Sequence, residues 1–212
     1  MPGIIDQLIA IGSIRRRPIF ECQIAGKEES LEFCMGFLKL ESISELLDLQ
    51  SIISESLPSR EIFITHDEEY FQRIFSLKRS VIGIVCNGKL IGYSFILIPG
   101  LRDDGLCENM GVDLNLPEEE LSKVAHLQSV AVHPVYRGNG LQKMMAAAHL
   151  HLIDEMGYVH VCSTVSPKNP ISLANLLSCG FLIEGLRPKF KGWWRFILHR
   201  STAAPDGFAT NG

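Results

Sequence analysis

Residues 130–142 read Val-Ala-Val-His-Pro-Val-Tyr-Arg-Gly-Asn-Gly-Leu-Gln, and they join an apolar strand to a helix through a glycine-containing turn. Apolar residues recur behind the turn at helical spacing, and they are Leu141, Met144, Met145, Ala148 and Leu152. This spacing predicts a helix that starts near Gly138 or Gly140. The first N–H groups of a helix have no internal partner, and the helix dipole places partial positive charge there. Because glycines let a phosphate approach these donors and Arg137 adds positive charge, the stretch predicts a site for a pyrophosphate-bearing ligand.

A simpler interpretation of the same stretch stays open on these residues alone. Glycines before a helix often only form the turn, and Arg137 can be an ordinary surface charge. The flanking residues favour the ligand site, because the segment resembles motif A of the GNAT superfamily of acyltransferases. These proteins transfer an acetyl group from acetyl-coenzyme A (acetyl-CoA) to an amine. The motif runs strand, Val-x-Pro, Tyr-Arg-Gly-x-Gly-x-Gly/Ala, helix, and the matching residues are Val132, Pro134, Tyr136, Arg137, Gly138 and Gly140. Gln142 departs from the motif, which has Gly or Ala there, and its side chain crowds the phosphate side.

A second stretch extends the resemblance. Asn169, followed by a proline, is a strong helix start, and Gly180 is a natural helix stop. The spacing of Asn169, Ser172 and the Gly-Phe pair at Gly180 also recurs in GNAT proteins. In those proteins the Asn often contacts the pantetheine arm in addition to capping the helix. The resemblance covers roughly residues 31–198 in element order.

The resemblance implies which residues hold the cofactor. In GNAT folds the central strand and its neighbour splay apart, which leaves backbone groups free for the pantetheine and the carbonyl oxygen. The main chain of residues 130–132 is therefore expected to line the cofactor. The full set expected to bind acetyl-CoA is Val130, Ala131, Val132, Arg137, Gly138, Asn139, Gly140, Leu141, Gln142 and Asn169. No metal site is expected, because the six cysteines show no CxxC and no metal-like spacing.

His126 is the candidate catalytic base. Acyl transfer needs a neutral amine and a stabilised oxyanion, and an imidazole with a pKa of about 6.5 can accept a proton at neutral pH. The phrase Ala125-His126-Leu127 also resembles the central strand of arylalkylamine N-acetyltransferases, where a His serves in proton removal. A lone His on a strand is often only a hydrogen-bonded structural residue, and that alternative stays open. By strand alternation Gln128 shares the face of His126 and could share the substrate pocket.

One common GNAT feature is missing. The helix after Asn169 usually carries a Tyr, seven residues on, that can protonate the leaving thiolate, and here that position is Leu176. Either water or another residue protonates the thiolate, or the chain is a non-catalytic acyl-CoA-binding or regulatory domain. A structural or interaction domain that has lost the cofactor is a third hypothesis.

Composition is that of an ordinary soluble domain. The chain has 212 residues, enough for one sizeable core and hardly more than one domain. A net charge of −4 argues against nucleic acid as a general partner. No segment has the roughly 20 uninterrupted apolar residues of a membrane span, and the basic cluster at 15–17 follows the apolar stretch, the wrong order for a signal peptide. We therefore expect a cytoplasmic protein with reduced thiols.

The chain reads as one mixed α/β domain with the GNAT fold. The expected sheet is mixed but mostly antiparallel, with splayed parallel central strands and flanking helices. Strands are expected near residues 19–24, 31–40, 81–86, 90–98, 124–132, 158–165, 181–186 and 193–199. Helices are expected at 4–11, 42–55, from Asp67, at 117–121, from about Gly140 and after Asn169. Residues 1–30 form an N-terminal extension, 31–200 the N-acetyltransferase domain and 201–212 a disordered tail.

The leading hypothesis is an acetyl-CoA-dependent N-acyltransferase that acts on a primary amine by direct attack on the thioester. The acceptor can be a small molecule or a peptide, because acceptor contacts lie in variable loops rather than in the motif. The sequence leaves acyl-chain preference and a homodimer open.

Overall fold

A computed structural model describes residues 5–8, 19–24, 27–77, 80–101, 107–190 and 192–202 of the chain. Of the disordered tail expected at residues 201–212, residues 203–212 lie outside the described residues, whereas Ser201 is the last residue of a strand. Within them, no helix is long and apolar enough to cross a membrane.

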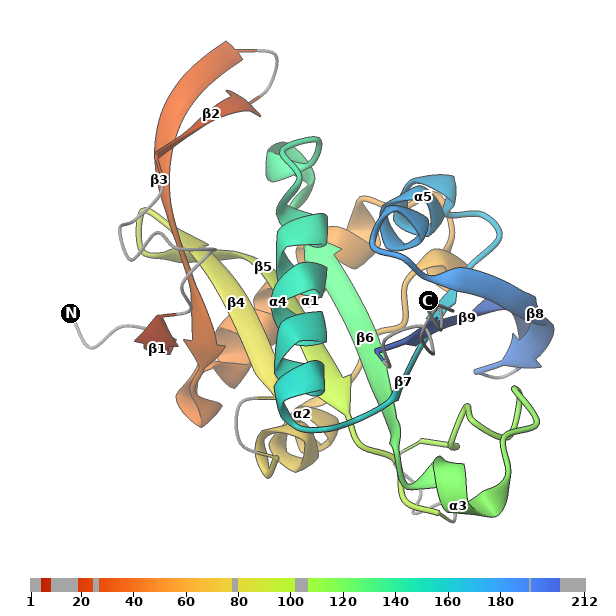
Figure 1. Cartoon of the computed structure of the whole chain (residues 1–212). Coiled ribbons are helices and arrows are strands. Elements are labelled where there is room, and N and C mark those ends of the chain that lie inside the picture. The colour runs from red at the N-terminus through yellow and green to blue at the C-terminus, as the bar shows by residue number, and fades with distance from the viewer. Residues whose placement is uncertain are drawn as a thin grey trace, which may run out of the picture.

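The described strands form one sheet in the order β1-β3-β4-β5-β6-β7-β9-β8, and β2 pairs with β3 off this path. The pairs within this order are antiparallel except for β6 and β7, which run parallel. The strands are β1 (Ile5–Leu8), β2 (Ile19–Ile24), β3 (Lys27–Leu38), β4 (Val81–Cys86), β5 (Lys89–Leu97), β6 (Val124–Val132), β7 (His160–Val165), β8 (Leu182–Lys189) and β9 (Trp193–Ser201). The predicted fold class, a mostly antiparallel mixed sheet with parallel central strands, is confirmed (Figure 1).

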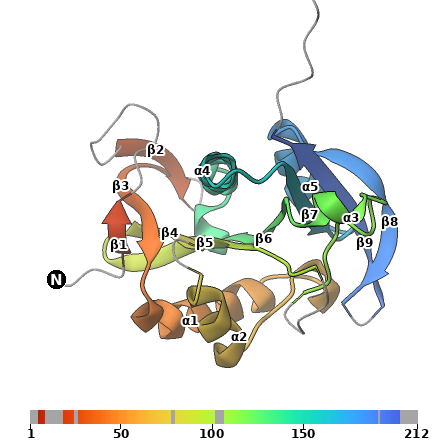
Figure 2. The same cartoon turned by 60° about the horizontal axis from the view of Figure 1, so that its bottom comes forward.

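Helices cover both faces of the sheet. The α-helices are α1 (Ile43–Glu55), α2 (Glu68–Phe75), α3 (Glu118–Leu121), α4 (Leu141–Glu155) and α5 (Pro170–Ser178), and the 3₁₀ turns are η1 (Leu40–Ser42), η2 (Arg60–Ile62) and η3 (Pro134–Tyr136). Figure 2 shows α1 and α2 on one face and α4 on the other. The core is accordingly divided: Leu46, Phe71 and Phe95 are buried on the α1–α2 side, and Met145 and Ile153 of α4 on the opposite side.

Local sequence explains the elements that frame the site. Asp67 caps α2, since its carboxylate accepts a hydrogen bond from the N–H of Tyr70 at 2.9 Å. Asn87 and Gly88 have φ values of 49° and 75°, as a tight hairpin between β4 and β5 requires. The predicted central strand 124–132 has the bounds of β6.

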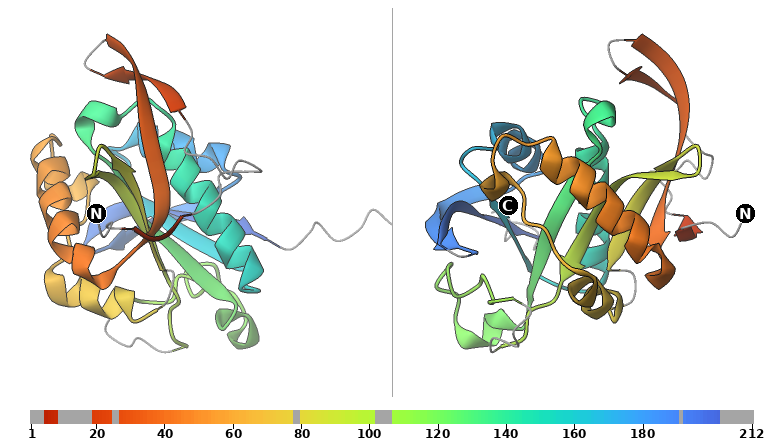
Figure 3. Two further views of the ribbon diagram at one scale, coloured as in Figure 1. Left: turned by 90° about the vertical axis from the view of Figure 1, so that its left-hand side faces the viewer. Right: turned by 180° about the vertical axis from the view of Figure 1, so that it is seen from behind.

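The N-terminal region differs from expectation. The predicted helix at 4–11 is wrong, because residues Ile5–Leu8 form strand β1 and pair with β3. The strand expected from residue 31 starts earlier, at Lys27, because the 27–32 segment pairs with β2. Hydrogen bonds from β3 thus determine the conformation of both flanking segments, and Figure 3 shows the long β3 that links them to the sheet.

Candidate active site

The parallel strands β6 and β7 separate after a short paired stretch. Only residues 124–126 of β6 pair with 160–162 of β7. One residue further, the Ser163 hydroxyl donates to the Leu127 carbonyl oxygen at 2.8 Å, so a side chain replaces the backbone ladder. Ser129 has φ 46°, and the pairing with β5 shifts register beside it, which marks a bulge in β6. The strand ends therefore diverge and leave space between them.

The turn after β6 positions the N-terminus of α4. Gly138 and Gly140 have φ values of 84° and 72°, in the left-handed region that favours glycine. Gly140 is the N-cap of α4 and offers no capping side chain to the first-turn N–H groups. A Cβ added at either glycine would meet no protein atom within 4 Å, so the turn opens onto free space.

A cavity of about 480 Å³ lies against this turn, and we call it the donor cavity. It is bounded by the end of β6, the start of α4 and the start of α5. Of the ten residues predicted to bind acetyl-CoA, nine line it: Val130, Ala131, Val132, Arg137, Gly138, Gly140, Leu141, Gln142 and Asn169. Asn139 does not, because its side-chain amide donates to the carbonyl oxygens of Tyr136 and Arg137.

Two polar side chains of the donor cavity are held by neighbours. The Arg137 guanidinium donates from Nη2 to the Ser56 hydroxyl at 3.0 Å, at the end of α1. The Gln142 amide donates to the Ser172 hydroxyl at 2.9 Å and accepts from the Asn175 amide at 2.6 Å. The Gln142 side chain therefore bridges α4 and α5 instead of covering the first N–H groups of α4.

Asn169 caps α5, as its position before a proline predicts. Its Oδ1 atom accepts a hydrogen bond from the N–H of Ser172 at 3.1 Å. The residue lines the donor cavity and also a smaller cavity of about 90 Å³, the central cavity, which lies where β6 and β7 diverge. Phe63, Val130 and Ser172 likewise line both cavities, so the two are adjacent.

A third, wider cavity opens beside the central one. This vestibule has a volume of about 800 Å³ and lies between α1, the α1–α2 loop and the β8–β9 turn. It shares Phe63, Ile64, His66 and Phe190 with the central cavity. The central cavity therefore connects a space at the α4 N-terminus with one at the α1–α2 loop.

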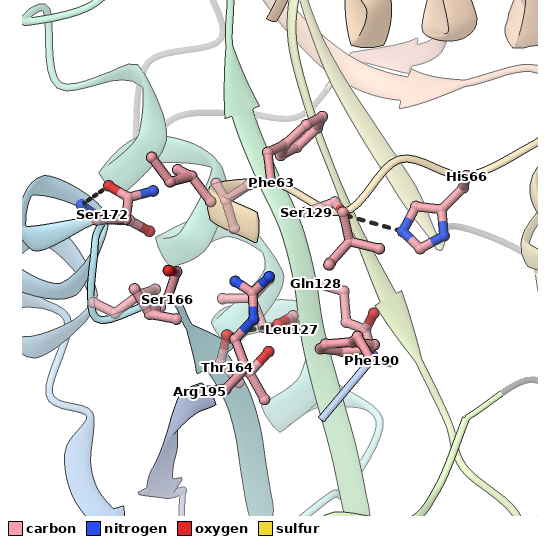
Figure 4. Close-up of a pocket in the computed structure, with 17 residues that line it drawn as sticks. Phe63, His66, Leu127, Gln128, Ser129, Thr164, Ser166, Ser172, Phe190 and Arg195 are labelled. Carbon is pink, nitrogen blue, oxygen red and sulfur yellow. Dashed lines mark hydrogen bonds between the residues drawn. The ribbon is translucent and has the colours of Figure 1, made fainter. Parts of the chain in front are cut away.

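His66 is a titratable residue of the central cavity that the sequence analysis did not single out. Two hydrogen bonds to the Gln50 side chain hold its backbone in place. The Gln50 amide nitrogen donates to the His66 carbonyl oxygen at 2.7 Å, and the Gln50 amide oxygen accepts from the His66 N–H at 2.8 Å. Its ring stacks on Tyr70, with centroids 4.0 Å apart. Its Nε2 lies 3.5 Å from the Ser129 hydroxyl, and Figure 4 shows the two side chains facing each other. Burial lowers the pKa of His66 to about 4, so the imidazole is neutral at pH 7.

His126, the predicted base, lies elsewhere. It is fully buried, and it lines none of the three cavities described above. Its Nε2 accepts from the N–H of Met110 at 3.1 Å, and its Nδ1 lies 3.6 Å from the Cys107 sulfur. Catalysis by His126 stays a prediction, and this environment argues against it. Gln128, predicted to share the pocket, does line the central cavity because the bulge at Ser129 turns the strand there.

A model of the acetyltransferase (GNAT) family matches residues 46–181, more than half of the chain. The chain belongs to the GNAT family. A search of curated proteins found no match.

Solved structures share the GNAT fold with this chain. The ribosomal-protein-S18-alanine N-acetyltransferase from Escherichia coli has a TM-score of 0.57 and 15% identity, over 82% of this chain and 96% of that one. The putative acetyltransferase yncA from Salmonella typhimurium, with its cofactor acetyl-CoA, has a TM-score of 0.62 and 15% identity, again over 82% and 96%. An N-acetyltransferase from Staphylococcus aureus Mu50 has a TM-score of 0.58 and 15% identity, over 80% and 98%. At these identities the likeness shows the fold alone.

This GNAT protein lacks a phenol where the family resemblance leads one to expect it. Leu176 is 2% exposed and lines the central cavity from α5. The nearby polar groups on this wall are Asn169 and Ser172, neither of which is an effective acid at neutral pH.

Proposed function

We propose that this GNAT protein is an acetyl-CoA-dependent N-acetyltransferase that transfers the acetyl group directly to a primary amine. The observation that carries the proposal is the divergence of β6 and β7. It opens a central cavity between a donor cavity at the N-terminus of α4 and a vestibule at the α1–α2 loop. Donor and acceptor can thus enter from opposite sides and meet where the strands part.

The residues of the donor cavity fit acetyl-CoA. Pyrophosphate oxygens suit the uncapped N–H groups that follow Gly140, where the helix dipole adds partial positive charge. Arg137 supplies a full positive charge at the same end. Asn169, which lines both cavities, is placed to contact the pantetheine arm between them. Acetyl-CoA supplies the activated acyl group as a thioester.

We propose His66 as the group that accepts the proton of the attacking amine, directly or through water. It lines the central cavity and the vestibule, and burial keeps its imidazole neutral. The amine nitrogen forms a bond to the acetyl carbon, the carbon–sulfur bond breaks, and the thiolate leaves. Since Leu176 cannot donate a proton, water protonates the thiolate. We further propose a small-molecule or peptide amine as the acceptor and the cytoplasm as the location.

The buried Leu176 also favours a second function, a non-catalytic acyl-CoA-binding or regulatory domain. Both functions require the donor cavity to bind acetyl-CoA. They differ in turnover, because only an enzyme releases free coenzyme A at a rate that depends on the amine.

Calorimetric titration of the full chain with acetyl-CoA is the first test, with coenzyme A and ATP as controls. We expect saturable micromolar binding of acetyl-CoA, followed by amine-dependent release of thiol and an acetylated product in the mass spectrum. Binding without transfer to any amine would support the regulatory function instead. No binding at millimolar acetyl-CoA would remove both functions.

A further inference from the structure

Arg195 places a buried positive charge in the central cavity. The residue lies on β9 and is only 3% exposed. Its side chain lines the central cavity, and Figure 4 shows the guanidinium directed into the space between Ser166 and Gln128. One of its amino groups donates to the carbonyl oxygen of Glu61, while its Nε has no hydrogen-bond partner in the part of the chain that the structure describes.

No carboxylate in the described structure forms an ion pair with this guanidinium. The Glu61 carboxylate contacts the ammonium group of Lys168 and acts on Arg195 only through its charge at longer range. The Arg195 guanidinium also lies over the ring of Phe190, with 5.6 Å between the guanidinium carbon and the ring centroid. A buried guanidinium is costly unless it is paired, and a carboxylate matches its planar donors in a bidentate arrangement. The cavity can therefore accommodate an anionic group that the described part of the chain does not supply.

An anion bound to Arg195 would lie close to the reacting amine. Arg195 and His66 line the same cavity, and Val130 connects it to the donor cavity. With about 90 Å³, the central cavity admits only the reacting end of an acceptor. Few atoms can therefore separate the amine from the anionic group.

The vestibule suits the remainder of such an acceptor. It offers about 800 Å³, and aromatic rings line part of its wall: Phe63, Tyr70, Phe190 and Trp193. A large apolar side chain packs favourably against rings of this kind.

Resting on the proposed function, we propose that the acceptor is a free amino acid with a large apolar side chain, whose carboxylate binds Arg195. The amino nitrogen forms a bond to the acetyl carbon, the carbon–sulfur bond breaks, and the amine proton leaves through His66. The products are an N-acetyl amino acid and coenzyme A, whose thiolate takes a proton from water. No further reactant is needed.

The test compares amino acids with their carboxamides, which differ only in the anionic group. Phenylalanine, tryptophan, methionine and leucine are each assayed beside the corresponding amide, with acetyl-CoA and the full chain. We expect kcat/KM to be about 100-fold higher for the acids, the scale of a lost buried charge pair. This comparison needs no substitution and does not depend on how a variant folds.

Two variants test whether Arg195 causes the difference in kcat/KM between acids and amides. Arg195→Gln is expected to lower kcat/KM for the acids by about 100-fold and to change that for the amides less than about threefold. Arg187→Gln is the matched control: Arg187 is the cross-strand partner of Arg195 on β8, carries the same charge and is exposed outside the cavity. It should leave both substrate classes unchanged.

Four outcomes would overturn the inference. Amides could be acetylated as well as acids, or Arg195→Gln could lower both alike, as a purely structural bond to Glu61 would predict. The protein could also acetylate amines without a carboxylate, such as polyamines, but not amino acids. This result would reject the amino acid acceptor and leave the proposed transferase function intact. Acetyl-CoA binding without transfer to any amine would reject both the transferase and the amino acid acceptor.

Discussion

The Nε2 atom of His126 accepts a hydrogen bond from the backbone N–H of Met110, 3.1 Å away. This bond occupies the lone pair that a general base would need, and the residue is fully buried. His66 differs, since it lines the central cavity and its Nε2 faces the Ser129 hydroxyl. We therefore expect substitution by glutamine to lower turnover at His66 and to leave it nearly unchanged at His126.

We expect His66→Gln to lower kcat about 100-fold, a typical contribution of general base catalysis, with acetyl-CoA affinity unchanged. Because burial lowers the pKa of His66 to about 4, its protonation should limit kcat/KM only near that pH. The matched variant His126→Gln should keep kcat within about threefold of the parent, once corrected for the folded fraction. Steady-state kinetics between pH 4 and pH 9, corrected for the folded fraction at each pH, and calorimetry check both. Loss of turnover and of the pH dependence in His126→Gln alone would restore His126 as the base.

Sequence reasoning predicted best what lies close together along the chain. The strand 124–132, the turn after it and the start of α4 follow from one continuous stretch, which supplies eight of the nine predicted cofactor residues that line the donor cavity. The ninth, Asn169, comes from the second stretch that the motif comparison singled out. His66 and Arg195 could not be found this way. His66 is 63 positions from Ser129, and Arg195 is 134 positions from Glu61, so only the folded sheet brings each to the cavity.

The failure at residues 4–11 has a related cause. A short apolar segment fits a helix or a strand about equally well, and tertiary pairing decides between them. Here β3 supplies the pairing partner for Ile5–Leu8. The bulge at Ser129 was also missed, because a non-glycine residue at positive φ leaves no pattern in the sequence.

Gly140→Ala tests the turn at the donor cavity. Alanine in the left-handed region costs about 1–2 kcal/mol, and relief of that strain would displace the N–H groups at the start of α4. We expect acetyl-CoA binding to weaken roughly tenfold, measured by calorimetry. Gly157→Ala is the control, because Gly157 has φ 80°, follows α4 at its other end and also faces open space. Equal weakening in both variants would show that general destabilisation, not the turn, is responsible.

Gln142→Ala addresses the departure from the GNAT motif. The Gln142 amide is engaged by Ser172 and Asn175, so it does not cover the N–H groups of α4. We expect the Kd for acetyl-CoA to change less than about threefold, and the unfolding free energy to fall by about 1–2 kcal/mol as two hydrogen bonds between α4 and α5 are lost. Binding that tightens tenfold or more in this variant would mean that Gln142 does obstruct the site. Calorimetry and urea unfolding give the two readouts.

Buried histidines make the protein sensitive to acid. Burial lowers the pKa of His126 to about 3, with a smaller effect from the charge of Lys189, and burial lowers that of His149 to about 3 as well. The unfolded chain takes up these protons near pH 6.5, whereas the folded protein does not. Stability is therefore full above pH 6.5 and falls with pH from 6.5 toward 3, by about 1.4 kcal/mol per pH unit for each residue.

Urea unfolding at pH 7 and pH 5 measures this loss, which should reach about 4 kcal/mol for His126 and His149 together, and His66, whose pKa burial lowers to about 4, should add about 2 kcal/mol. His149→Gln is expected to remove about a third of the pH dependence, because His149 is one of three buried histidines whose pKa is lowered and glutamine does not titrate. His151→Gln is the control: His151 lies two residues further along α4, but its side chain is 76% exposed. Its substitution should leave the difference between the two pH values unchanged. A His149→Gln variant with the parent's full pH dependence would show that this residue is protonated in the folded state as readily as in the unfolded one.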